Sequence, residues 1–194
     1  MSRRQKLLTL ATALGIVTAL GGCLALSPHQ MDHSQIDAYT ELAKKPLPAA
    51  PAKQREAIAR WQALLADFST ENIRGKVAGV YAEDTFFNDT LKTLRSPQAI
   101  EDYLLETCEM LHYGRVEYED VAVSGEDVYV RWRMLYRSKK LNKKQDIITI
   151  GMSHLRFDDQ GKVILHQDFW DATRGIFEHV PLVGSGIRAV KKRL

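Results

Sequence analysis

Near its end the 194-residue chain reads Gly161-Lys162-Val163-Ile164-Leu165-His166-Gln167-Asp168-Phe169-Trp170-Asp171. The segment follows a turn over residues 158–161, and as a strand it places His166, Asp168 and Trp170 on one face. An acid, an imidazole and an indole fill an apolar core poorly, because a buried carboxylate without a partner is costly. This face therefore indicates the wall of a cavity in which polar groups find partners.

Working back from this strand, the preceding residues predict more strands. The segments 115–123, 128–137 and 146–157 are rich in strand-forming residues and are separated by turn signals. Together with 161–171 they predict an antiparallel meander. A shorter strand-prone segment, Tyr81 to Thr90, lies further upstream.

Helices precede the meander. Apolar residues at helical spacing predict a helix from Gln54 to Phe68 and another from Gln98 to His112, which Pro97 opens. Ser69 to Asn72 can cap a second short helix toward Val80. The expected fold class is α+β, with these N-terminal helices packed on one face of a curved antiparallel sheet.

The chain begins like an exported protein. Basic residues precede an apolar run, Leu7 to Leu20, which is too short for a transmembrane helix and suits a secretory signal. The next residues, Leu20-Gly21-Gly22-Cys23, resemble a bacterial lipobox. The resemblance implies a signal peptide over 1–22, lipidation of Cys23 and attachment to the cell envelope, and Leu24 favours the outer membrane facing the periplasm. An uncleaved anchor or an ordinary exported protein remain alternatives.

Residues 23–53 are polar and then rich in proline and alanine, which predicts a tether to a domain over 54–194. The charge balance, 27 Lys and Arg against 24 Asp and Glu, is too small for a nucleic-acid partner. No Cys/His cluster has metal-ligand spacing, and no dinucleotide or phosphate-binding motif occurs, so we expect neither a metal nor a cofactor. Cys108 is expected to be a buried apolar residue.

The order of elements carries a family likeness. Between Gln54 and Thr173, the segment Tyr81-Ala82-Glu83-Asp84-Thr85-Phe86-Phe87-Asn88-Asp89 and the ending Asp168-Phe169-Trp170-Asp171 resemble the nuclear transport factor 2-like superfamily. This superfamily holds SnoaL-like cyclases, ketosteroid isomerase and limonene epoxide hydrolase. The resemblance implies a cone-shaped α+β fold and a homodimer formed through the outer face of the sheet. Because one fold serves many chemistries, it predicts structure better than function.

The resemblance also implies roles for residues. Asp89 falls on the general base of the isomerase, Trp61 on its oxyanion tyrosine and Ser153 on its protonated acid. An indole is only a donor and a serine is a weaker acid, so this oxyanion hole differs from that of the isomerase. Asp168 falls on an acid or base of the epoxide hydrolases. Those enzymes also use an arginine and a second aspartate from a middle strand, and the corresponding strand here has two arginines, Arg131 and Arg133, but no carboxylate.

The residues alone leave the two acids open. Asp89 and Asp168 could act in acid–base chemistry, or Asp89 could cap the turn at Thr90 while Asp168 pairs with Arg131, Arg133 or His166. His154 and Arg156 alternate away from Ser153, so we expect them to face solvent or a dimer partner.

Eight side chains are candidates for contact with a ligand, although aromatic residues in strands also serve as ordinary core: Trp61, Tyr81, Phe87, Trp132, Met134, Ser153, His166 and Trp170. The favoured hypothesis is an envelope lipoprotein whose cone binds an apolar or amphipathic small molecule in a non-catalytic or accessory role. The alternative is a small-molecule isomerase, cyclase or hydratase that uses Asp89 and Asp168 as acid and base. The basic segments 139–144 and 191–193 could also touch anionic lipid near the anchor.

Overall fold

A computed structural model describes residues 32–47, 54–142 and 145–194 of the chain. The expected signal peptide and the expected lipidation site, Cys23, lie outside these residues. Residues Gln35–Leu194 form a compact unit. Within the described part of the chain, no helix has the length and apolar character needed to cross a membrane.

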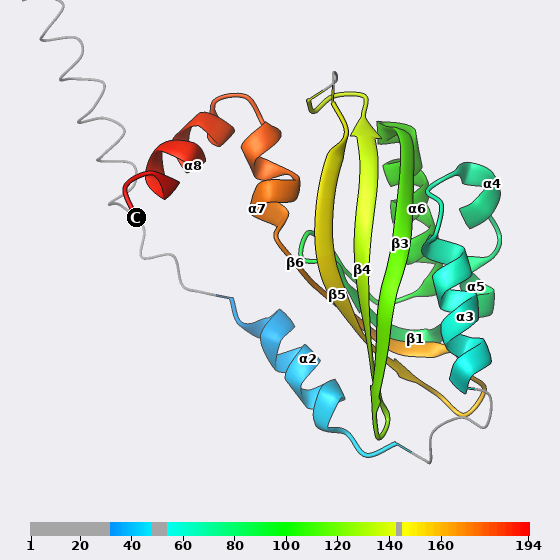
Figure 1. Ribbon diagram of the computed structural model, residues 1–194. Coiled ribbons are helices and arrows are strands. Elements are labelled where there is room, and N and C mark those ends of the chain that lie inside the picture. Colours follow the sequence, from blue (N-terminus) through cyan, green and yellow to red (C-terminus); the bar gives the residue numbers. More distant parts are fainter. Residues whose placement is uncertain (1–31, 48–53, 143–144) are drawn as a thin grey trace, which may run out of the picture. The chain divides into compact units, whose positions relative to one another are not determined.

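A six-stranded sheet forms the centre of this unit (Figure 1). The strands lie in the order β2-β1-β6-β5-β4-β3. Their bounds are β1 Tyr81–Asn88, β2 Thr93–Leu94, β3 Leu111–Ser124, β4 Asp127–Ser138, β5 Ile147–Phe157 and β6 Val163–Trp170. The antiparallel meander predicted from the sequence is β3 to β6. The sheet as a whole is mixed, because β1 lies parallel to β6.

Four helices cover the inner face of the sheet and confirm the α+β class (Figure 1). They are α3 Gln54–Leu65, α4 Thr70–Ile73, α5 Val77–Val80 and α6 Pro97–Met110. The α3 helix buries the predicted stripe, including Ile58, Trp61 and Leu64. The α6 helix begins where Ser96 accepts from the backbone N–H of Ala99 and Pro97 occupies the first turn.

The outer face of the sheet has a cover that the sequence does not predict. Within the segment expected to be a tether, Ser34–Lys44 forms a helix, α2. The hydroxyl of Tyr39 lies 3.0 Å from Nδ1 of His154, and the guanidinium of Arg156 donates to the carbonyls of Leu42 and Lys45 at 2.6 and 2.7 Å.

The expectation that His154 and Arg156 face solvent or a dimer partner is therefore wrong. Both point outward from β5 as predicted, but their exposed fractions are only 2% and 3% because α2 and the β3–β4 turn cover them. Arg156 also pairs with Glu126 at 2.6 Å and Asp127 at 3.0 Å. A buried cation needs such partners, since an isolated one would be too costly.

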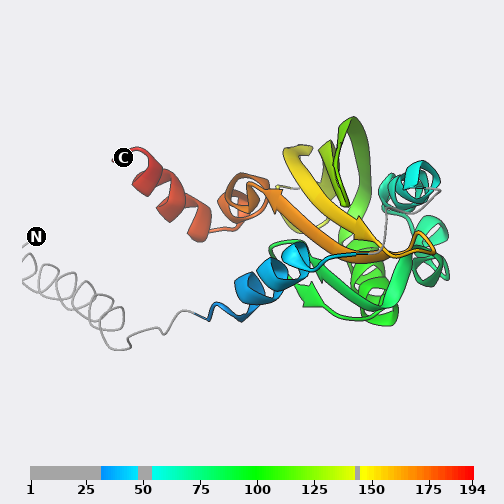
Figure 2. The ribbon, with the colours of Figure 1, turned by 90° about the horizontal axis from the view of Figure 1, so that it is seen from below.

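The chain continues past β6 into short helices: α7 Ala172–Gly175, a 3-10 turn η1 Phe177–His179, and α8 Val183–Lys191. Figures 1 and 2 both show α8 beyond α7 and away from the strands. The α7 turn is fixed to the sheet because the Tyr136 hydroxyl donates to the carbonyl of Gly175.

Candidate functional site

A cavity of about 340 Å³ lies between the helices and the inner face of the sheet. Aromatic and aliphatic side chains form most of its wall. Nine residues singled out from the sequence line it: Trp61, Phe87, Asp89, Trp132, Met134, Ser153, His166, Asp168 and Trp170. The shared face of His166, Asp168 and Trp170 is thus a wall of a cavity. Tyr81 is fully buried behind this wall.

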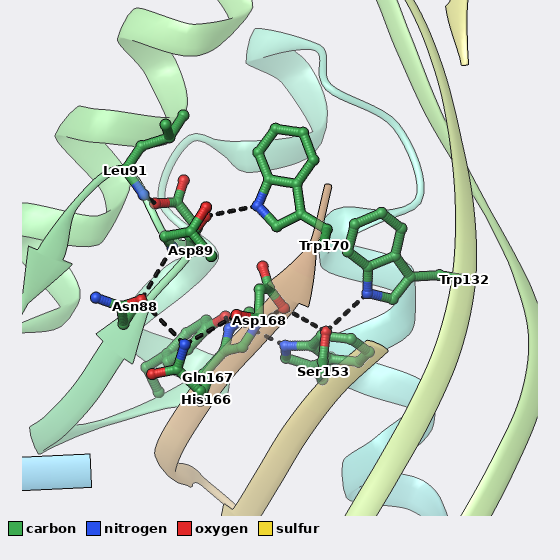
Figure 3. A network of polar contacts seen from close by, with 12 residues as sticks. Asn88, Asp89, Leu91, Trp132, Ser153, His166, Gln167, Asp168 and Trp170 are labelled. Atoms are coloured by element: carbon green, nitrogen blue, oxygen red, sulfur yellow. Dashed lines mark hydrogen bonds and ion pairs between the residues drawn. The ribbon is translucent and has the colours of Figure 1, made fainter. Parts of the chain in front are cut away.

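Asp168 is the centre of a polar network in this apolar setting (Figure 3). Its Oδ1 accepts from the Ser153 hydroxyl at 2.5 Å and lies 2.9 Å from Nε2 of His166. Ser153 in turn accepts from the Trp132 indole at 2.9 Å. The register of the sheet produces this arrangement, since Ser153 on β5 is the direct cross-strand partner of Asp168 on β6.

A second layer orients His166. The Trp61 indole lies 3.2 Å from the Tyr81 hydroxyl oxygen, and that hydroxyl lies 2.8 Å from Nδ1 of His166. Because an indole can only donate, Tyr81 accepts from Trp61 and uses its own proton toward Nδ1 of His166. The proton of a neutral imidazole is then on Nε2, from which it is donated to Asp168. Burial raises the pKa of Tyr81 well above its usual value, which keeps its hydroxyl a donor.

Some polar atoms of the wall have no protein partner among the described residues, and two of them belong to Asp168 and Tyr118. Oδ2 of Asp168 has no hydrogen bond or ion pair among the described residues, and Figure 3 shows contacts on the other oxygen alone. The hydroxyl of Tyr118 is buried and also lacks a partner within the described residues. Burial, and then the charge of Asp168, raise the pKa of Tyr118, so this hydroxyl stays protonated.

Asp89 differs from Asp168 because both of its oxygens are engaged. Oδ1 accepts from the backbone N–H groups of Leu91 and Lys92 at 2.9 and 2.8 Å, and Oδ2 accepts from the Tyr103 hydroxyl. Burial raises the pKa of Asp89, and these hydrogen bonds oppose the rise. Asp89 therefore caps the turn after β1, which is the structural alternative left open by the sequence.

The two residues at the oxyanion-hole positions of the isomerase, Trp61 and Ser153, donate to protein acceptors here. The indole proton of Trp61 is directed to Tyr81, and the Ser153 hydroxyl is directed to Asp168. On β4, Arg131 and Arg133 are exposed on the face opposite to Trp132, and Arg131 pairs with Glu119 at 3.3 Å. Of the partners considered for Asp168, the structure gives it His166 and neither arginine.

Tyr103 and Tyr118 are among the polar wall residues that the sequence reasoning missed. Tyr118 faces the cavity because it is the cross-strand partner of Trp132. Alternation along the expected strand 115–123 puts it on the same face as Val116, so the signal was present in the sequence. Tyr103 comes directly before Leu104, an apolar residue of the expected helix 98–112. In the described ranges, no three His, Cys, Asp or Glu side chains gather so that they could hold a metal ion.

Comparison with protein families gives one match. A family model of the SnoaL-like domain matches residues 61–166, a range that runs from the start of the cavity wall on α3 to His166 on β6. A search of curated proteins finds no match.

Several solved structures share the fold. A protein from Catenulispora acidiphila with a ketosteroid isomerase-like fold, in complex with trimethylamine, is 15% identical at a TM-score of 0.55, and the match covers 62% of this chain and 89% of that one. A candidate SnoaL-like polyketide cyclase from Shewanella putrefaciens is 15% identical at a TM-score of 0.53, over 66% of this chain and 94% of its own. A similar candidate cyclase from Jannaschia is 15% identical at 0.51, over 68% and 96%. At these identities the likeness is one of fold.

Proposed function

The chain belongs to the SnoaL-like domain family, and we propose that its cavity binds an apolar or amphipathic small molecule whose polar group is held by Tyr118 and Asp168. The observation that carries the proposal is that two polar atoms of a mostly apolar wall, the Tyr118 hydroxyl and Oδ2 of Asp168, have no protein partner among the described residues. A buried donor without a partner costs roughly 1–3 kcal/mol. A ligand that accepts from this hydroxyl removes the cost when it binds.

The two atoms select the chemistry of the ligand. Tyr118 offers a proton and the carboxylate oxygen Oδ2 of Asp168 can accept one, so a single ligand group that both accepts and donates fits both. A hydroxyl group or a primary amide on an apolar body has this property. The cavity volume of about 340 Å³ is near the lower end of the range for small-molecule sites, roughly 300–1,000 Å³. The ligand is therefore compact.

The cellular setting is part of the proposal. Residues 1–23 support export and lipidation at Cys23, and with them a position at the outer membrane facing the periplasm. Large apolar residues left exposed on the outer face of the sheet, Ile148, Ile150, Met152 and Phe169, support a homodimer through that face.

A second candidate function is acid–base catalysis by Asp168. The specific observation in its favour is that Ser153 and His166 hold Oδ1 while Oδ2 stays free to exchange a proton. In such a reaction a substrate carbonyl accepts from Tyr118, and Oδ2 removes a proton from the adjacent carbon. Both carboxylate oxygens of Asp89 already accept hydrogen bonds from the protein, which favours a structural role for this residue over a role as the acid–base partner of Asp168.

Binding is tested with a medium-chain alcohol, decanol, and the alkane of the same length, by titration calorimetry on the protein purified without detergent. We expect the alcohol to bind roughly tenfold more tightly than the alkane, which corresponds to one buried hydrogen bond. This preference should disappear in Tyr118→Phe. The matched control is Tyr113→Phe, since Tyr113 donates to Asp146 and does not line the cavity. Equal binding of alcohol and alkane by the unmodified protein would overturn the proposal.

Catalysis is tested separately by following deuterium incorporation next to the carbonyl of cyclohexanone in heavy water by NMR. Acid–base catalysis predicts exchange that Asp168→Asn abolishes and Asp89→Asn retains. Exchange no faster than in buffer alone would remove this second candidate and leave the binding proposal standing.

A further inference from the structure

The C-terminal helix α8 has an apolar stripe that the described chain covers only in part, at Ile187. Val183, Ile187 and Val190 are spaced by four and three residues, so they share one face of the helix. Val183 and Val190 are 49% and 58% exposed, and the preceding Leu182 is 89% exposed. Leu194, which continues the same spacing, is fully exposed.

The helix is attached to the domain by a different face. Gly184 packs directly on the backbone carbonyl of Glu178 in η1, where a side chain would not fit. Arg188 donates to the same carbonyl at 2.8 Å, and Lys191 pairs with the Glu178 carboxylate at 2.5 Å. In helical projection these contacts lie about a quarter turn from the apolar stripe. The attachment therefore leaves the stripe directed outward.

Basic residues flank the stripe. Residues 180–194 contain four of them, Arg188, Lys191, Lys192 and Arg193, and no acidic side chain. Lys192 and Arg193 have no salt bridge among the described residues. A short helix with one apolar stripe and a basic polar side is typical of segments that lie in the interface of an anionic bilayer. A protein groove would be expected to need shape complementarity, whereas a lipid surface needs only this pattern.

We propose that α8, with Leu182 and residues 192–194, docks on an anionic lipid surface. The apolar stripe enters the boundary between headgroups and acyl chains, and the basic residues contact lipid phosphates. The inference does not depend on the ligand proposed for the cavity, nor on lipidation of Cys23.

The docking surface adjoins the rim of the cavity. Ile176, between α7 and η1, lines the cavity, as do the partly exposed Met110 and Leu91. Two further exposed lysines, Lys139 and Lys140, follow β4 at the end of the sheet where Figure 1 also shows α7. Docking of α8 thus sets this rim next to the lipid surface.

The test measures hydrogen exchange of backbone amides 183–194 in the full chain, mixed with vesicles of phosphatidylcholine alone or with added phosphatidylglycerol. A local readout is needed because the N-terminal apolar run could bring the chain to either vesicle. We expect roughly tenfold slower exchange in this segment with the anionic vesicles, since each basic residue near such a surface contributes to binding. The protection should be lost in Val190→Asp and in the triple variant Lys191→Gln, Lys192→Gln, Arg193→Gln.

The matched control removes the same number of charges elsewhere, through Arg55→Gln, Arg74→Gln and Lys76→Gln, which are exposed on or beside α3 and α5. It should retain the protection. The proposal is overturned if anionic lipid leaves the exchange of 183–194 unchanged. It is also overturned if protection appears without vesicles and grows with protein concentration, because the stripe would then pack against a second copy of the chain.

Discussion

The Tyr81 hydroxyl lies 2.8 Å from Nδ1 of His166, and both side chains are buried, with exposed fractions of 0% and 1%. This contact determines which nitrogen of the imidazole meets Asp168. Because Nδ1 is occupied as an acceptor, Nε2 carries the proton that is donated to Oδ1 of Asp168. A residue outside the cavity wall thus sets the protonation pattern of the wall.

Replacing Tyr81 with Phe should therefore affect stability and the site together. Tyr81→Phe leaves the Trp61 indole and Nδ1 of His166 buried without partners, so we expect the free energy of unfolding to fall by about 1–3 kcal/mol. Urea denaturation measures this change, and nitrogen NMR of His166 should show a changed balance of tautomers. Tyr113→Phe, which alters a partly buried tyrosine–aspartate pair outside the cavity, serves as the control. An unchanged tautomer in Tyr81→Phe would show that Tyr81 does not orient His166.

Trp170 is held in place by a glycine. A side chain at Gly175 would collide with the indole ring of Trp170, whose Nε1 donates to the backbone carbonyl of Asp89 at 2.7 Å. Gly175→Ala should displace this ring and destabilise the domain by about 1–3 kcal/mol, the usual cost of overpacking. Tryptophan fluorescence should shift to longer wavelength as water reaches the ring. Gly79→Ala, where the added carbon meets nothing within 4 Å, should show neither effect.

The pKa of Asp89 predicts a specific pH dependence. Burial raises this pKa above its usual value of 3.8, so the folded state binds more protons than the unfolded state in the window just above that value. The stabilising contribution is complete below the usual pKa and is lost as the pH rises through the raised one. Relative to Asp89→Asn, the unmodified protein should therefore lose stability between about pH 4 and 6. Urea midpoints across this range measure the difference.

The exposed Asp84 supplies the control, because Asp84→Asn should leave the shape of the pH profile unchanged. A profile of Asp89→Asn that runs parallel to that of the unmodified protein would contradict a raised pKa at Asp89.

Local patterns in the sequence predict most of the fold. Helical spacing predicts α3 and α6, and alternation places His166, Asp168 and Trp170 on one face of β6, where the structure has them lining a cavity. Pairing of β1 with β6 is different, because it joins segments about eighty residues apart and depends on the whole domain.

The same distinction applies to the site. The sequence identifies both acids, Asp89 and Asp168, but not how their hydrogen bonding differs. That difference depends on backbone N–H groups at the turn after β1 and on the pairing of Ser153 with Asp168. The α2 helix has no buried residue. Its position depends on Arg156 and His154, which lie more than a hundred residues later in the chain.

Acid should loosen α2. Burial lowers the pKa of His154 below its usual 6.5, and the nearby Arg156 lowers it too, while Asp127 opposes the change. The folded state therefore binds fewer protons than the unfolded state, so stability is present above the usual pKa and is lost as the pH falls through the lowered one. Protonation would also place a proton on Nδ1 of His154, which now accepts from the hydroxyl of Tyr39 on α2, so this hydrogen bond would be lost in its present direction. The ring of Tyr129 stacks on the same imidazole.

We expect exchange of the α2 amides, corrected for intrinsic rates, to accelerate as the pH falls from about 7 to 5, with a parallel fall in the urea midpoint. His154→Gln should flatten both trends, because glutamine keeps a donor for Asp127 but does not titrate. Tyr39→Phe should weaken α2 at every pH and keep the slope, since the imidazole still titrates. The exposed His112→Gln is the control for histidine replacement. If exchange and urea midpoint depended on pH equally in His154→Gln and His112→Gln, the buried imidazole would not be the group through which acid loosens α2. The carboxylates that pair with Arg156 would then be replaced next.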